Sequence, residues 1–307
     1  MNFTLSRLAG LFFGYALFVQ TMLAGEVVSE KPAEEAEVAP MPGIFNTELP
    51  RLLRPEFLRL SLRPHFGDFV HHDHLRITLG ARYALTSQWE LSGDTDMYMS
   101  HGLGGVPVGE ETGFSKVRLG VKYNFIDFLR PYWTTAVGLK YTFPVGNPPP
   151  DLTDGLHHIT PYMTLAHQWE SRPAFTTFVS YGLDFVTQSD VRGTIEDGGV
   201  DANTWFITPG VVWHRGAFDY SLETVFTSTA GLDSNENYRV TLRPGVKWTL
   251  PPGLTFHSRS RWVVGVSAHA DYGSTGSNFG TSLRLETNFD FKRLFKGSSR
   301  SGVDAAK

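Results

Sequence analysis

A short run in the C-terminal part of the chain contains a histidine and serines, the residue types that a hydrolytic site would use. The run is His257-Ser258-Arg259-Ser260. A serine nucleophile needs a base within hydrogen-bond reach and a third group that orients the base. Polar and apolar residues alternate around this run, which predicts a β-strand, and neighbours on a strand point to opposite faces. His257 and Ser258 therefore cannot pair, and we expect a protein that is not an enzyme.

Histidines on or beside predicted loops are the second group that could carry chemistry. The candidates are His71, His72, His74, His157 and His158. Imidazole binds Zn and Cu well, but these residues lack the spacing of a tetrahedral site. They are weak metal candidates, and we expect no metal and no cofactor. The chain also has no glycine-rich phosphate loop and no basic-aromatic stripe, so we expect no nucleic-acid partner.

A four-residue motif returns along the chain: Gly, an apolar residue, a basic residue and an aromatic. Its copies span residues 80–83, 120–123, 138–141 and 245–248, and a looser copy is Gly210-Val211-Val212-Trp213. Each copy lies in a run of alternating polar and apolar residues, which predicts a strand with two different faces. The polar face carries Arg and Lys, which the core of a water-soluble protein would not accept. A sheet that is apolar outside and charged inside is typical of a transmembrane β-barrel.

Alternating segments recur at even spacing, and each is long enough to cross a bilayer at a tilt. The predicted spans are 57–66, 75–86, 88–99, 115–126, 131–143, 158–170, 173–188, 203–215, 217–228, 237–250, 253–268 and 279–291. Short connections alternate with long ones, which is typical of outer-membrane barrels. A soluble β-sandwich would show the same alternation, but one unbroken array with aromatics near the strand ends favours the membrane. The predicted fold is an all-β, antiparallel, up-and-down transmembrane barrel of about 12 strands.

The ends of the 307-residue chain differ from this array in composition. Residues 1–25 read as a signal peptide, with an uncleaved anchor as the alternative. Residues 26–55 are acidic and then rich in Pro, which predicts a flexible periplasmic lead or a short plug inside the barrel. The barrel would span 56–291, and 292–307 would form a disordered basic tail. We therefore expect a protein of the outer membrane, in contact with outer-membrane lipid.

The polar parity of the strands predicts fourteen basic and eight acidic residues on the lumen face, with Lys116, Arg118, Lys122 and Lys140 among the basic ones. A subset of this face would set the selectivity of the lumen. The basic members are Arg59, Arg63, Arg76, Arg82, Arg239, Arg243, Lys247, Arg259, Arg261 and Arg284, and the acidic members are Glu90, Asp94 and Asp96. Basic residues outnumber acidic ones on this face although the whole chain has a net charge of -4. This predicts a channel for small solutes with a bias toward anionic or dipolar ones. A closed barrel whose lumen is filled by salt bridges stays open as an alternative, and an outer-membrane lipid-modifying enzyme is less favoured.

Two further segments support an outer-membrane barrel. The segment Leu139-Lys140-Tyr141-Thr142-Phe143-Pro144-Val145-Gly146, followed by a Pro-rich loop, resembles the "MetA-pathway of phenol degradation" group of putative outer-membrane transporters. The resemblance covers most of residues 57–291 and implies uptake of small, in part aromatic, compounds. The segment from Asn278 to Leu285, which begins the final predicted strand, resembles the signal that the barrel assembly machinery recognises, although a basic tail follows the strand.

Overall fold

The computed structural model describes residues 47–50, 54–66, 74–103, 105–125, 132–149, 152–169, 171–191, 202–232, 237–251, 254, 261–274 and 276–290. Within these ranges the chain forms twelve β-strands. They are β1 (Phe57–Phe66), β2 (His74–Ala84), β3 (Trp89–Ser100), β4 (Thr112–Phe125), β5 (Trp133–Pro144), β6 (Leu156–Trp169), β7 (Arg172–Gln188), β8 (Thr204–Arg215), β9 (Phe218–Ser228), β10 (Tyr238–Thr249), β11 (Arg261–Gly273) and β12 (Gly276–Asp290). No helix among these residues is long and apolar enough to cross a membrane.

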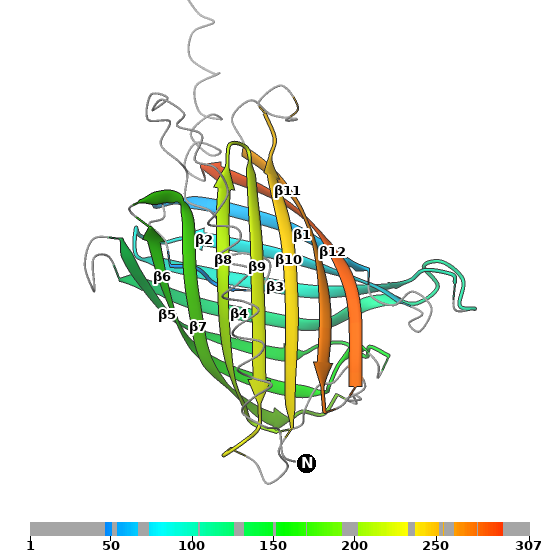
Figure 1. Cartoon of the computed structure of the whole chain (residues 1–307). Helices are drawn as coiled ribbons and strands as arrows, with labels where there is room; N and C mark the ends of the chain where they lie inside the picture. The colour runs from blue at the N-terminus through cyan, green and yellow to red at the C-terminus, as the bar shows by residue number, and fades with distance from the viewer. Residues whose placement is uncertain are drawn as a thin grey trace, which may run out of the picture. The chain divides into compact units, whose positions relative to one another are not determined.

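The strands form one closed sheet in which each strand pairs with its sequence neighbours (Figure 1). All pairings are antiparallel, and β1 pairs with β12 to close the ring, with Leu60 opposite Thr287 and Phe66 opposite Thr281. Closure leaves no free sheet edge, which is the condition for a sheet to stand in hydrocarbon. The structure confirms the predicted fold class of a twelve-stranded antiparallel barrel.

The two faces of the sheet differ as the alternation predicts. Large apolar side chains on one parity are exposed on the outside, such as Leu60 and Leu62 on β1 and Leu79 on β2. The other parity carries buried polar groups such as Thr78, Glu90 and Asp96. A soluble sandwich would bury the first set instead, so the outer face suits lipid and the inner face suits water.

Aromatic side chains form a band on the outer face at the strand ends next to the short turns. Trp89 contacts Tyr123 with ring centroids 4.8 Å apart, and Phe218 stacks on Trp248 at 6.1 Å. Aromatics concentrate at membrane–water interfaces because the ring is apolar and its edge is polar. At the opposite end, the indole nitrogen of Trp205 donates a hydrogen bond to the Ala230 carbonyl at 3.1 Å.

The prediction for the eleventh strand was wrong at its C-terminal end, while most of its expected N-terminal part lies outside the described residues. β11 runs from Arg261 to Gly273, whereas the expected span was 253–268 with a long loop over 269–278. Residues 269–273 keep the alternation of a strand, with His269 opposite Gly280 and Asp271 opposite Asn278 across β12. Only residues 274 and 275 separate β11 from β12, and Gly276, the first residue of β12, has a φ of 120°, which favours glycine. Small and polar residues here extend a hairpin rather than form a loop.

The structure describes only part of the expected lead. Thr47, Glu48, Leu49 and Pro50 are buried. Thr47, Glu48 and Leu49 contact lumen-facing side chains of the barrel, through an ionic and apolar fit that composition does not reveal. The flexible lead or short plug over residues 26–55 stays a prediction. The expected signal peptide and basic tail lie outside the described residues.

Three aromatic rings on the inner face lie flat across a glycine of the neighbouring strand. Tyr162 lies against Gly138, Phe206 against Gly182 and Phe178 against Gly210, each pair directly opposite in the ladder. A Cβ atom at any of these glycines would overlap the ring. The glycines thus leave room for an aromatic lining over β5 to β8.

We expect Gly210→Ala to lower the free energy of unfolding by about 1–3 kcal/mol, because Phe178 is held by Leu49, Ala166 and Val212 and cannot move aside freely. Urea unfolding of the refolded protein in detergent micelles measures this change. Gly93→Ala is the matched control, since the nearest atom to its Cβ would be Leu119 Cδ2 at an ordinary 3.8 Å. Adding Phe178→Ala to Gly210→Ala should cancel part of the loss. Equal effects at positions 210 and 93 would contradict this explanation.

Candidate functional site: a charge-lined lumen

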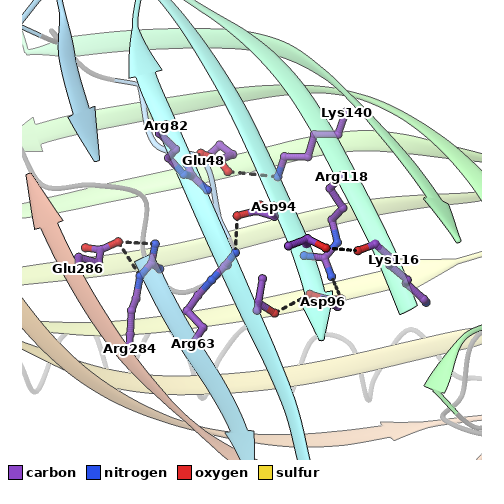
Figure 2. Close-up of polar contacts among 12 residues, drawn as sticks. Glu48, Arg63, Arg82, Asp94, Asp96, Lys116, Arg118, Lys140, Arg284 and Glu286 are labelled. Carbon is purple, nitrogen blue, oxygen red and sulfur yellow. Dashed lines mark hydrogen bonds and ion pairs between the residues drawn. The ribbon is translucent and has the colours of Figure 1, made fainter. Parts of the chain in front are cut away.

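The described members of the predicted selectivity set all lie on the inner parity of their strands. They are Arg59 and Arg63 on β1, Arg76 and Arg82 on β2, Glu90, Asp94 and Asp96 on β3, Arg239, Arg243 and Lys247 on β10, Arg261 on β11 and Arg284 on β12. Arg259 lies outside the described residues. Figure 2 shows several of these side chains projecting from different strands into one shared space.

Ion pairs connect the wall formed by β1 to β4. Arg63 Nη2 lies 2.7 Å from Asp94 Oδ1, and Arg118 pairs with Asp96 (Figure 2). Asp96 also accepts a hydrogen bond from the Thr78 hydroxyl at 2.6 Å. At these carboxylates, cations and a hydroxyl take the place of water.

The glycine of the recurrent four-residue motif explains how these pairs reach across the strands. Gly80 of β2 lies between Ser61 of β1 and Asp94 of β3 in the ladder. A Cβ on Gly80 would overlap the carboxylate of Asp94, so this glycine lets Asp94 lean over β2 toward Arg63 on β1. The motif therefore supplies a gap and, two residues later, a cation on the same face.

A second group of charges surrounds the segment Thr47–Pro50, which we call the strap. Glu48 pairs with Arg82 of β2, its Oε1 lies 3.3 Å from Lys140 Nζ of β5, and its Oε2 lies 3.9 Å from Lys122 Nζ of β4. Lys122 also donates a hydrogen bond to the Leu49 carbonyl at 3.3 Å. We call Arg82, Lys122 and Lys140 the cation cage. The cage holds a carboxylate that does not belong to the barrel wall.

The strap makes two further contacts on the far side of the lumen. Thr47 donates a hydrogen bond to Glu223 Oε2 of β9 at 3.0 Å. The Leu49 side chain packs in a buried cluster with Ala166 of β6, Phe178 of β7 and Val212 of β8. Val212 occupies the basic position of the looser motif copy, so the one copy with an apolar residue at that position forms the apolar part of the lumen.

A polar cluster joins the loop before β6 to the wall. The imidazole of His158 lies between two carboxylates, with Nδ1 2.8 Å from Asp184 Oδ2 and Nε2 3.1 Å from Asp154 Oδ2. Lys116 Nζ lies 3.2 Å from Asp154 as well. Burial alone would raise the pKa of the Asp154 carboxyl, but the His158 hydrogen bond and the Lys116 charge hold this pKa well below its usual value. The cluster fixes the loop to β4, β6 and β7.

The predicted metal candidates do not converge. His74 contacts Glu111 at 2.8 Å, His157 stacks on Tyr141, and His158 sits in the cluster above. His71 and His72 lie outside the described residues, as do His257 and Ser258. Where the structure describes the chain, it shows no group of three or more His, Cys, Asp or Glu side chains that could hold a metal ion.

Sequence reasoning missed Glu48, which lies in a segment without periodicity. It placed Lys122, Lys140 and Arg118 on the lumen face but not among the selectivity residues. One signal could have found Glu48, namely the surplus of basic over acidic residues on the inner parity. That surplus requires either solvent or a carboxylate from another segment.

Comparison with known proteins places the fold. No protein-family model and no curated protein sequence matches the chain. Its structure is similar to that of the COG4313 outer membrane channel from Pseudomonas putida F1, with a TM-score of 0.54, 10% identity, and coverage of 78% of this chain and 97% of that chain. The NanC porin matches with a TM-score of 0.48 and 13% identity, covering 75% of this chain and 98% of that chain. The KdgM porin matches with a TM-score of 0.45 and 8% identity over the same shares of the two chains.

The first of these likenesses shows that the chain has the fold of an outer-membrane β-barrel channel. At such low identity it shows the fold and no finer property. The "MetA-pathway of phenol degradation" family is matched by no family model and stays a prediction.

We expect Arg284→Met to lower the free energy of unfolding by roughly 3–5 kcal/mol, because it leaves the Glu286 carboxylate buried without its cation. Arg284 Nη2 lies 2.6 Å from Glu286 Oε1, and the two side chains are 2% and 0% exposed. The measurement is the urea unfolding midpoint in detergent micelles. Arg284→Met combined with Glu286→Leu should restore most of the stability, since no charge is then stranded. Lys116→Met, in the more exposed pair with Asp154, is the control and should cost under about 1 kcal/mol. A loss at Arg284 no larger than at Lys116 would rule the explanation out.

Proposed function

We propose that the protein is an outer-membrane channel for small solutes, with a bias toward anionic or dipolar ones. On this proposal the chain is exported by its signal peptide, inserted by the barrel assembly machinery and surrounded by outer-membrane lipid. Its likeness in fold to an outer membrane channel supports the location and the class. The proposal assigns no catalytic residue, and it gives the charged groups of the described inner face an electrostatic role.

One observation carries the anionic bias: in three ion pairs the cation is half-buried and reaches solvent, whereas its carboxylate is buried. The exposed fractions are 32% for Arg118 against 3% for Asp96, 31% for Lys140 against 8% for Glu48, and 26% for Arg239 against 8% for Asp271. These side chains lie on the inner parity, so the surface that a solute meets in the lumen is richer in positive charge than the residue count suggests. Positive charge on a low-dielectric wall attracts anions and raises their local concentration.

A closed structural barrel is the second candidate, and the strap favours it. Thr47, Glu48 and Leu49 take space inside the barrel and bind seven of its strands, and the Arg284–Glu286 pair is sealed from solvent. In this candidate the charges serve to fill the lumen and not to conduct. The two candidates differ in one measurable property, the passage of ions.

We expect the refolded full-length protein to produce discrete conductance steps in a planar bilayer, with a reversal potential that favours anions under a salt gradient. Arg239→Glu should shift that potential toward cations, because it places a carboxylate beside Asp271 on the exposed inner surface. Arg215→Glu is the control for charge, since Arg215 lies over the Trp213 ring on the outer parity of β8 and should leave selectivity unchanged.

Folding must be checked in the same samples. An antiparallel barrel that keeps its fold migrates differently on a gel before and after heating, and this shift shows which samples are native. Native protein without conductance would reject the channel and favour the closed barrel. Conductance with equal shifts of the reversal potential for Arg239→Glu and Arg215→Glu would show that the inner cations do not set the selectivity.

A further inference from the structure

We infer that the lumen contains a binding site for small carboxylates that bear an apolar group, and that the strap occupies this site with the chain's own Glu48 and Leu49. This inference deepens the proposed channel and rests on it for the route by which a solute reaches the site. The site consists of the cation cage and the adjoining apolar cluster. Its ligand class follows from what these two parts hold in the structure.

The cation cage has more positive charge than its own wall neutralises. Arg82, Lys122 and Lys140 supply three cations, whereas Glu90, which lies 3.0 Å from Lys122 and 3.8 Å from Arg82, is the wall carboxylate among them. Glu48 supplies the second carboxylate, and it comes from a segment outside the strands. A buried cation needs a partner, so the cage requires an anion whether or not that anion is Glu48.

The geometry of the cage suits a carboxylate rather than a single point charge. Arg82 pairs with Oε2 of Glu48, while Lys140 lies 3.3 Å from Oε1. Cations from β2 and β5 thus reach the two oxygens separately, as they would for any carboxylate in that position (Figure 2).

The residue after Glu48 identifies the second half of the ligand. Leu49 buries its side chain against Ala166, Phe178 and Val212, which are all apolar. Tyr162 stands at the edge of the cage, with Lys140 Nζ 5.2 Å from the centre of its ring. An aromatic or branched aliphatic acid would place its carboxylate in the cage and its apolar part on this surface. A simple inorganic anion or acetate would use only the first half.

Competition with Glu48 makes the site testable. When an internal group occupies a site, the apparent affinity for an external ligand falls by the fraction of molecules in which the site is free. Removing the Glu48 charge should therefore tighten the binding of an external carboxylate. Removing a cage cation should weaken it, whatever happens to the strap.

The experiment is isothermal titration calorimetry of the full-length protein in detergent, with benzoate as the probe and benzamide as its neutral analogue. We expect benzoate to bind and benzamide to bind at least about tenfold more weakly, because the cage is cationic. Glu48→Gln should lower the Kd for benzoate roughly tenfold. Lys140→Gln should raise the Kd for benzoate by a similar factor. This variant leaves no buried charge without a partner, because Lys140 is 31% exposed and Glu48 keeps Arg82 and Lys122. Acetate should bind more weakly than benzoate to every variant.

Lys116→Gln is the matched control, because Lys116 is on the same strand as Lys122 but pairs with Asp154 and contacts no part of the strap. It should leave the Kd for benzoate unchanged. Equal Kd values for benzoate in the wild type, Glu48→Gln and Lys140→Gln would overturn the inference, as would equal binding of benzoate and benzamide. Calorimetry requires no open pore, so benzoate binding without conductance would reject the channel and keep the site. Conductance without benzoate binding would reject the carboxylate site and keep the channel.

Discussion

The hydrogen bonds between β1 and β12 are the interaction on which the rest of the structure depends. An unpaired backbone N–H or C=O costs several kcal/mol in hydrocarbon, so a sheet with two free edges could not remain there. The pairing of the first and last strands removes both edges. Once the sheet is closed, every second side chain must point into a confined space. The inward-facing polar side chains of each strand therefore have to fit inside the ring, where charged groups either form ion pairs or remain in contact with water.

Glycine residues relieve the crowding of side chains on the inner face. On the inner face, Gly80 makes room for Asp94, Gly120 for Ser92 and Gly138 for Tyr162, each at the position directly opposite in the ladder. Side chains can then cross a neighbouring strand and meet a partner on the strand beyond it. The recurrent motif of glycine, apolar residue, cation and aromatic thus encodes two environments within four residues. Glycine and the cation serve the lumen, and the two residues that alternate with them serve the lipid.

Alternation was enough to predict the closed sheet, its strand number and the inner placement of residues such as Arg63 and Asp94. It assigns a face to each side chain, because its period is two. It does not assign a partner, since the pairing of Arg63 with Asp94 depends on a gap at Gly80 one strand away. The end of β11 was misplaced because His269 to Gly273 has the composition of a loop while its alternation continues. Glu48 could not be assigned from its own surroundings, because its place depends on cations that lie 34 to 92 residues further along the chain.

The strap also bears on the order in which the barrel can be assembled. The seam between β1 and β12 joins residues far apart in the chain, as in the Arg59–Asn288 contact across 229 positions, so its loop-closure entropy is large. Glu48 instead meets Arg82 across only 34 positions. The contacts of Glu48 with β2, β4 and β5 can therefore form while the sheet is still an open, curved ribbon. The strands then wrap around a segment already in place, and no finished tube has to be threaded from one end.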